Sequence, residues 1–266
     1  MLPLPPEELC DYSAKIGSSS RLVQGPGGNT SCKEGSNVWV KASGKWLAEA
    51  ENENIFCLVS PPEPKIDLTP GSILRPSIEA YFHTLLPMKA IFHVHSLGSL
   101  TWAIRSDGQA VLQKYFPELL WVAYQKPGRE LAEALAELYH DNNSVGAILQ
   151  NHGMVIWGDS LKQCYERLLD YEGRLLYLAK SVRADKDTYS TNLDDLNDGT
   201  YFTPDHAVFS TPGSDTQKDW ERQVLEVIAE AIDLIPLTTT LSSLSPESVK
   251  ELINWEAEIF RRQTNA

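Results

Sequence analysis

The sequence is short of basic residues. Lys and Arg together number 23 against 36 Asp and Glu, which gives a formal net charge of −13. Nucleic-acid phosphates are bound by clustered Lys and Arg, so this shortage argues against nucleic acid as a partner. It does not exclude a small anionic ligand, because such a ligand needs only a local positive site.

Long apolar runs and paired cysteines are also missing. Nothing approaches the roughly 20 consecutive apolar residues of a membrane span, so we expect no membrane partner. The first six residues lack the basic and apolar regions of a signal peptide. The cysteines Cys10, Cys32, Cys57 and Cys164 are scattered without paired spacing, which is typical of reduced thiols. We therefore expect a cytoplasmic protein.

Length and composition are those of an ordinary globular protein. The chain has 266 residues, 42% hydrophobic and 22% charged, which is enough for one large domain with a sizeable core. Apolar spacing predicts helices over 6–16, 76–86, 97–104, 129–140, 160–182, 220–235 and 246–262. Strands are predicted over 29–33, 37–41, 55–59, 89–96, 145–149 and 154–157. This mixture of strands and flanking helices predicts an α/β sandwich.

Two histidines lie one residue apart in an apolar strand. Side chains on a strand alternate between its faces, so His93 and His95 share one face while Phe92 and Val94 share the other. A third histidine, His152, follows another apolar run in the stretch Gln-Asn-His-Gly. A His-x-His pair with a distant third His is a common arrangement for a catalytic zinc ion that keeps an open coordination position.

A His-x-His pair alone is a weak signal, because single histidines are more often satisfied core or surface residues. Here it occurs in order with Gly27-Gly-Asn-Thr-Ser31, Lys41-Ala-Ser-Gly44, Pro76-Ser-Ile-Glu79 and Gln150-Asn-His-Gly153. This ordered set resembles the class II aldolase/adducin family, which includes fuculose- and rhamnulose-phosphate aldolases and ribulose-phosphate epimerase. The resemblance covers roughly residues 5–185 and is strongest to the aldolase half of bifunctional aldolase/dehydrogenase proteins.

The resemblance implies a three-layer α/β sandwich, with a central mixed and largely antiparallel sheet flanked by helices. It also implies a homotetramer with sites at subunit borders. We expect residues 1–215 to form the class II aldolase-like domain. Residues 216–266 are expected to form a helical extension packed on the same domain.

The family resemblance also assigns chemical roles. It implies that His93, His95 and His152 bind a divalent cation, with zinc expected first and Mn, Co or Fe also compatible with three imidazoles. Glu79 matches the glutamate that the family uses as acid and base. The alternative for Glu79 is a stabilising charge in the first turn of a helix that Pro76 opens. His83, four residues later, is interpreted as a supporting residue rather than a ligand.

Five residues match the family's phosphate and substrate cradle. Glycines let backbone N–H groups approach an anion, and a helix start adds a positive dipole. The matching residues are Gly28, Asn29, Ser43, Gly44 and Ser77.

The sequence departs from the family pattern at Pro26 and Ile78, where two hydroxyl donors are missing. Lys41 stands where related aldolases are usually uncharged, and we expect it to bind the anionic end of the substrate. The alternative is an exposed lysine at a strand end. The family's tyrosine acid has no secure match, with Tyr115 and Tyr124 as weak candidates.

The resemblance favours a metal-dependent lyase that acts on a small anionic, sugar-derived substrate. The expected reaction is retro-aldol cleavage of a ketose phosphate or sugar acid through a metal-stabilised enediolate. A decarboxylase, dehydratase or 4-epimerase on the same scaffold is an open alternative. An adducin-like interaction module ranks lower, because the metal histidines that adducin-type relatives lack are all present, and a metal-binding protein with decayed activity is a third reading. The role of His206, in a Pro-Asp-His motif, stays open.

Overall fold

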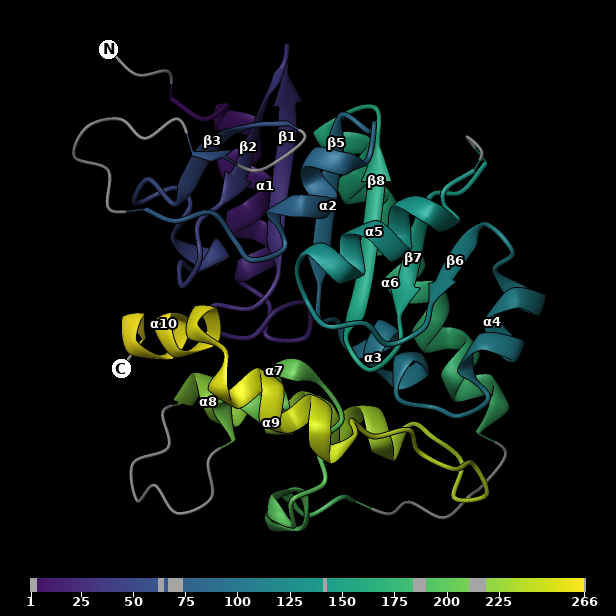
Figure 1. The fold of residues 1–266 in the computed structure, drawn as a ribbon. Helices are drawn as coiled ribbons and strands as arrows, with labels where there is room; N and C mark the ends of the chain where they lie inside the picture. The colour runs from purple at the N-terminus through teal and green to yellow at the C-terminus, as the bar shows by residue number, and fades with distance from the viewer. Residues whose placement is uncertain are drawn as a thin grey trace.

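The computed structural model describes residues 4–61, 65–66, 74–140, 143–183, 190–210 and 219–265. Within these residues one eight-stranded sheet has the order β4-β3-β2-β1-β5-β8-β7-β6 (Figure 1). Its strands are β1 (Asn29–Glu34), β2 (Asn37–Lys41), β3 (Phe56–Ser60), β4 (Lys65–Ile66), β5 (Ala90–Val94), β6 (Leu119–Val122), β7 (Gly146–Leu149) and β8 (Gly153–Gly158). Neighbouring strands are antiparallel except β6 and β7.

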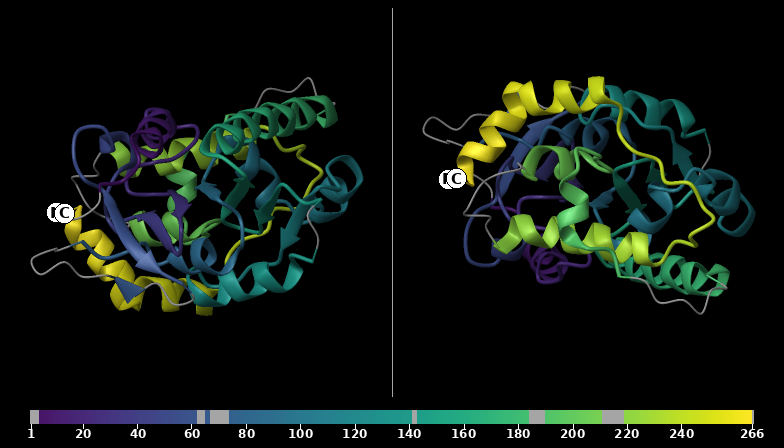
Figure 2. Two further views of the ribbon diagram at one scale, coloured as in Figure 1. Left: turned by 90° about the horizontal axis from the view of Figure 1, so that it is seen from above. Right: turned by 90° about the horizontal axis from the view of Figure 1, so that it is seen from below.

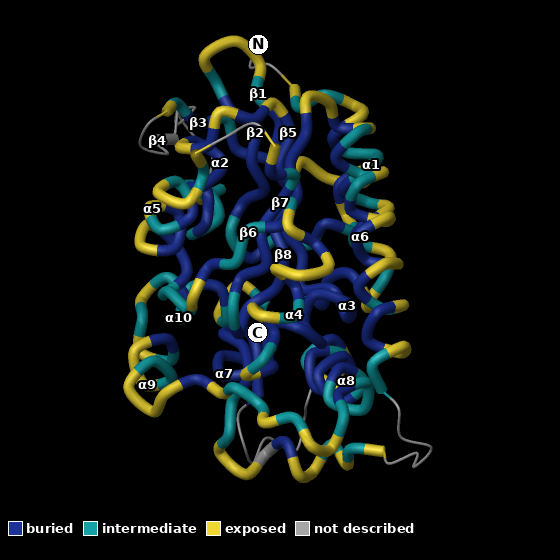
Figure 3. The backbone as a smooth tube through the Cα atoms, turned by 90° about the vertical axis from the view of Figure 1, so that its right-hand side faces the viewer, coloured by how far each residue is buried: buried dark blue, intermediate teal, exposed yellow. Residues whose placement is uncertain are grey.

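Helices cover both faces of the sheet. One face packs against α1 (Glu7–Gly17) and α6 (Leu161–Val182), and the other against α2 (Ala80–Leu85) and α5 (Arg129–Leu138). Figure 3 shows the buried sheet between these two layers, and Figure 2 shows helices on both sides of the strands from above and below. The predicted three-layer sandwich with a mixed, largely antiparallel sheet is therefore confirmed.

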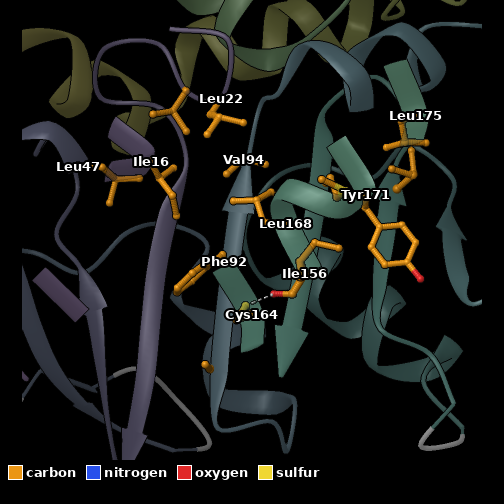
Figure 4. Packing of buried hydrophobic residues seen from close by; sticks show 14 of the residues in the cluster. Ile16, Leu22, Leu47, Phe92, Val94, Ile156, Cys164, Leu168, Tyr171 and Leu175 are labelled. Carbon is orange, nitrogen blue, oxygen red and sulfur yellow. Dashed lines mark hydrogen bonds between the residues drawn. The ribbon is translucent and has the colours of Figure 1, made fainter. Parts of the chain in front are cut away.

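The side chains of β5 alternate as expected. Phe92 and Val94 belong to the larger core cluster, where they pack with Ile156 and Leu168 under α6 (Figure 4). The side chain of Ile91 packs in the cluster on the opposite face. His93 shares that opposite face, and its ring lies edge-on to Phe82 of α2 with the ring centroids 5.6 Å apart. The core thus fixes the direction in which His93 points.

The C-terminal helices gather beyond one end of the sheet. They are α7 (Pro204–Phe209), α8 (Asp219–Asp233), α9 (Pro246–Asn254) and α10 (Glu256–Thr264). Figure 1 shows them in green and yellow below the strands, and the right-hand view of Figure 2 shows them across that end. The expected boundary near residue 215 falls in 211–218, outside the described residues, and it stays a prediction.

Contacts between elements hold this C-terminal group in place. The helix α8 packs on α3 (Leu97–Ala103), and α7 contacts both α9 and α10. The helix expected over 246–262 is in fact two helices, because Trp255 adopts an extended backbone conformation between them. Residues 108–122, for which the sequence analysis predicts neither helix nor strand, form α4 (Gly108–Tyr115) and β6. No helix in the described part of the chain is long and apolar enough to cross a membrane.

Candidate metal centre

The three predicted histidines meet at the end of the sheet that the C-terminal helices cover. His93 lies in β5, His95 follows that strand, and His152 precedes β8. Because β5 and β8 are paired with Val94 opposite Met154, the end of one strand lies beside the start of the other. One nitrogen from each imidazole lies within 4.8 Å of the others, and all three residues are buried. The structure therefore brings the predicted ligand set together.

A hydrogen bond orients one of the imidazoles, and a close contact with a carboxylate orients a second. His93 Nδ1 donates to the carbonyl oxygen of Met154 at 3.0 Å, and His95 Nδ1 lies 2.9 Å from Asp205 Oδ2. With both Nδ1 atoms facing oxygen atoms, the two Nε2 atoms point toward each other and are only 3.1 Å apart. Two imidazole nitrogens this close can share one cation. This donor set fits a divalent metal ion.

Two of the histidines are also in the protonation state that metal binding requires. Burial lowers the pKa of His152 to about 3, and it lowers the pKa of His93 well below its ordinary value. Both imidazoles are therefore neutral near pH 7. Neutral imidazole is the form that coordinates a metal, so no proton has to leave before binding.

The backbone conformation of Asn151 produces the tight turn in which the third histidine lies. It has a positive φ of 55°, a conformation that Asn tolerates better than most residues. Its amide nitrogen donates to Phe202 O at 3.0 Å and Ser242 O at 2.7 Å, and its amide oxygen accepts from Ser242 Oγ at 2.9 Å. The turn that presents His152 is therefore fixed by C-terminal residues.

Glu79 lies against the histidines. Its Oε1 is 3.3 Å from His152 Nε2, and its Oε2 is 3.3 Å from His93 Nε2. Glu79 is the N-cap residue of α2, so the predicted alternative, a charge that stabilises the start of a helix, stays a prediction beside the proposed chemical role. The side chain makes no capping hydrogen bond to α2, and it is buried beside the imidazoles.

The expected helix start at Pro76 is wrong. The helix α2 begins at Ala80, and residues 76 and 77 instead pair with the segment after β2. Ser77 N donates to Lys41 O at 2.9 Å, and Pro76 forms an isolated bridge with Ala42. These contacts hold the segment extended and override the local signals for a helix. Ser77 therefore does not lie at a helix start, and no helix dipole acts at this residue.

A hydrogen-bonded chain holds the Glu79 carboxylate. Asn29 Nδ2 donates to Glu79 Oε2 at 2.9 Å, and the Asn29 oxygen accepts from His83 Nε2. His83 Nδ1 in turn lies 2.5 Å from Ser31 Oγ. Burial lowers the pKa of His83 well below its ordinary value, so this ring is neutral. Asn29 pairs with His93 in the β1–β5 ladder, which places this chain beside the ligands.

The remaining cradle residues divide into two groups. Gly28 and Ser77 lie close to the site, because a Cβ at Gly28 would be 2.8 Å from His93 O and Ser77 Oγ is 3.3 Å from Asn29 Nδ2. Ser43 and Gly44 form a turn after β2. Asn265 at the end of α10 donates to Gly44 O at 3.2 Å, so the C-terminal helix covers this turn.

Lys41 is not the exposed strand-end lysine of the alternative interpretation. It is 2% exposed, and its Nζ donates to Pro26 O at 2.7 Å and to Lys45 O at 2.6 Å. Burial lowers its pKa to about 7. The ammonium group thus ties the glycine loop to the 42–45 turn and has one further donor.

Sequence reasoning missed three charged residues beside this site. Asp205 of α7 contacts His95, and Arg261 of α10 forms an ion pair with Asp205 and another with Glu258. The Pro-Asp-His motif contains Asp205, although the sequence analysis considered only its histidine. His206 has a structural role, because Phe202 N donates to its Nδ1 and its Nε2 contacts Leu196 O.

Neither tyrosine candidate is placed as the missing acid. Tyr115 is exposed at the end of α4, and Tyr124 packs in the C-terminal cluster that contains Leu244 and Leu252. Burial raises the pKa of Tyr124 to about 12. The four cysteines are unpaired, and burial raises the pKa of Cys32 and Cys57 to about 12, which makes these thiols poor nucleophiles.

Comparison with known proteins gives a consistent family match. Residues 7–175 match the model of the class II aldolase and adducin N-terminal domain. The chain is 30% identical over 196 residues to the uncharacterized oxidoreductase YuxG of Bacillus subtilis, a match that covers 63% of this chain and 28% of that protein. It is 31% identical over 113 residues to a 3-oxo-tetronate 4-phosphate decarboxylase of Escherichia coli, covering 37% of this chain and 52% of the relative. The chain therefore spans only part of these relatives.

A solved structure shares the fold. The N-terminal class II aldolase domain of a conserved protein from Thermoplasma acidophilum matches with a TM-score of 0.56 and 23% sequence identity. The match covers 67% of this chain and 96% of that domain. The whole segment that carries α7 to α10 lies outside the residues matched by the family model.

Proposed function

Because the chain belongs to the class II aldolase and adducin family, we propose that it is a metal-dependent lyase that cleaves a small ketose phosphate, or a related sugar acid, by a retro-aldol step. The observation that carries the proposal is the convergence of three buried histidines with the Glu79 carboxylate. A site built only for stability has no need to bury three imidazole nitrogens within 4.8 Å of one another with a carboxylate 3.3 Å from two of them.

The ligands and the metal follow from the donor set. His93, His95 and His152 would hold a divalent cation, with zinc as the first expectation and Mn, Co or Fe as alternatives. When bound, the cation supplies Lewis-acid stabilisation of the negative charge that develops on a substrate carbonyl oxygen. The buried position of the histidines, 0% to 5% exposed, strengthens such electrostatic stabilisation because bulk water is excluded.

Glu79 is proposed as the acid and base. Its Oε2 is fixed by the Asn29 amide, whereas Oε1 accepts no hydrogen bond within the described structure. One carboxylate oxygen is thus held in place while the other can take or return a proton. General acid–base groups contribute typically ~10²–10⁴-fold in rate, so the residue is worth testing directly.

The anionic end of the substrate is proposed to lie against Gly28, Ser77 and Lys41. Ser77 Oγ lies 3.3 Å from Asn29 Nδ2, and Lys41 has one donor beyond its hydrogen bonds to Pro26 O and Lys45 O. Ser43 and Gly44 keep their proposed role only in a state where α10 leaves their turn uncovered. A homotetramer and a cytoplasmic location are further proposals that follow from the family alone.

Decarboxylation is a second candidate, and it is favoured by the 31% identity to a 3-oxo-tetronate 4-phosphate decarboxylase. Both reactions break a carbon–carbon bond beside a carbonyl group and need the same metal and a proton donor. The site geometry therefore supports both, and only the products separate them.

The test supplies metal-loaded protein with L-fuculose and L-rhamnulose 1-phosphates and with 3-oxo-tetronate 4-phosphate. Aldehyde release from a ketose phosphate supports the retro-aldol proposal, and carbon dioxide release supports the second candidate. Glu79→Gln should keep its metal and fold while losing most turnover. A His93→Ala/His152→Ala variant that is folded and still fully loaded with metal would contradict the ligand assignment.

A further inference from the structure

The helix α10 buries charged side chains rather than apolar ones. Glu258 and Arg261 are its buried residues, at 1% and 9% exposed, whereas Ile259 and Phe260 are only partly buried. Placing charges inside a protein is costly unless they are paired and hydrogen-bonded. Burial of apolar surface does not explain why this face of α10 is buried. The explanation must lie in the residues that Glu258 and Arg261 contact.

Those partners lead directly to the metal centre. The Arg261 guanidinium donates to Asp205 Oδ1, and Asp205 Oδ2 is 2.9 Å from His95 Nδ1. Burial alone would raise the pKa of Asp205, but the charge of Arg261 and the contact with His95 hold it well below its usual range. The Arg261 guanidinium on one oxygen of Asp205 thus holds the other oxygen of that carboxylate against His95 Nδ1.

The second ion pair of Arg261 fixes the guanidinium from its other side. Its Nε lies 2.9 Å from Glu258 Oε2, one turn earlier on α10. Burial raises the pKa of Glu258 to about 7. The guanidinium thus lies between two carboxyl groups, one on α7 and one on its own helix.

The glycine loop before β1 is shaped around the same contact. A Cβ at Gly27 would lie 2.9 Å from Asp205 Oδ2 and 3.1 Å from His95 Nδ1. A side chain there would push Asp205 away from the imidazole. This glycine therefore serves the Asp205–His95 contact, independently of any contribution that its backbone makes to anion binding.

We propose that Arg261 is a positioning residue of the metal centre, and that docking of α10 and metal binding are coupled through Arg261, Asp205 and His95. Carboxylates that accept from a metal-bound histidine fix its tautomer and ring orientation. Arg261 does the same for the carboxylate. The coupling is reciprocal, so a metal that favours the docked helix is itself bound more tightly when the helix is docked. The proposal rests on the proposed metal centre and not on the reaction.

The first test measures Zn²⁺ affinity of the full-length protein by competition with a chelating dye. Arg261→Met removes the fork that holds Asp205, and loss of such outer partners typically weakens metal binding by about 10–100-fold. The matched control is Arg262→Met, because Arg262 is adjacent on α10 but donates to Ile253 O instead. We expect weakened binding in the first variant and wild-type affinity in the control, with both folded by circular dichroism.

Two further measurements keep the proposal testable if Arg261→Met is unstable. Arg261→Lys keeps the charge but loses the planar fork, and Co²⁺ absorption spectra would report an altered ligand field at the metal. Hydrogen exchange of the wild-type protein should also slow over residues 256–265 when Zn²⁺ is added. Wild-type affinity and spectra in the folded Arg261 variants, or α10 exchange that ignores the metal, overturns the coupling. A wild-type protein that binds no metal overturns the metal centre itself, which distinguishes the two failures.

Discussion

Replacing Asn29 with Asp changes the contact that holds the proposed base. The Asn29 amide nitrogen donates to Glu79 Oε2 at 2.9 Å, while its oxygen accepts from His83. Asp has nearly the same shape, so the acceptor facing His83 is kept. At the other position a carboxylate oxygen replaces the N–H donor. A hydrogen bond therefore becomes a close contact between two acidic groups.

The size of the effect follows from the distance. Two unit charges 2.9 Å apart repel by about 6 kcal/mol at an effective dielectric constant of about 20. Two carboxylates this close avoid the repulsion by holding a proton between them. The folded variant then has a carboxyl pKa raised by up to about four units, at about 1.4 kcal/mol for each unit. The proton shared by the two carboxyl groups stabilises the folded variant. Because the folded-state pKa is raised, this contribution to stability is present below about pH 4 and is lost as the pH rises through the raised value.

Urea unfolding of the metal-free protein at about pH 5 and about pH 8 measures this loss. Asn29→Ala is the control, since it removes the donor at a cost of about 1 kcal/mol without adding a charge. We expect the stability difference between Asn29→Asp and Asn29→Ala to widen by up to about 4 kcal/mol between the two pH values. An equal loss in both variants at both pH values would refute the contact between Asn29 and Glu79.

Three further predictions concern single residues. Gly153→Ala places a Cβ 2.4 Å from Val94 O, so β5 and β8 must shift, and Tm should fall with a loss of about 1–3 kcal/mol; an unchanged Tm would show that the backbone has room. Lys41→Met should weaken binding of an anionic substrate or inhibitor by about 1.5–3 kcal/mol in isothermal titration, with metal content unchanged; equal affinity would leave Lys41 as a tie between loops only. Burial lowers the pKa of His206 to about 4, so its contribution to stability is present above about pH 6.5 and is lost as the pH falls. When the pH falls from about 7.5 to about 5, the free energy of unfolding of His206→Gln should therefore decrease by about 2 kcal/mol less than that of the wild type, as measured by urea unfolding. The same decrease in both proteins would count against this.

The fold and the ligand set were accessible from the sequence because their signals are local or ordered. Strand alternation predicted that Phe92 and Val94 enter the core while His93 points to the other face, and the structure confirms it. Five motifs in a fixed order predicted the family and therefore the sheet. The position of His152 beside His93 and His95 needed β5 and β8 to be neighbours.

Features that depend on distant contacts were not accessible. The helix expected at Pro76 starts later because residues 76 and 77 pair with the segment after β2, more than thirty positions earlier in the chain. Lys41 is buried because the glycine loop and its own turn close around its ammonium group. Arg261 reaches Asp205 across 56 positions, and nothing periodic in the sequence marks that contact.

The charges around the site lead to a last prediction about the substrate. Glu79, Asp205 and Glu258 interact with Lys41 and Arg261, and Glu258 also interacts with Arg262, so three acidic and three basic side chains balance one another around the site. The pKa values of Glu258 and Lys41 are both about 7, so near pH 7 both groups are partly charged and the balance is kept.

A divalent cation turns this balance into a positive excess, and the excess attracts an anion strongly because charges are poorly screened in a buried site. A chain with a net charge of −13 therefore depends on its metal to admit an anion. We expect a small carboxylate or phosphate ester to bind the Zn²⁺-loaded protein and not the metal-free protein in isothermal titration. In the Zn²⁺-loaded protein, Lys41→Met should weaken this binding, because the anion would keep its contact with the metal but lose its contact with Lys41. Binding of equal strength without metal would show that Lys41 and Arg261 suffice, and that the charge balance does not control entry to the site.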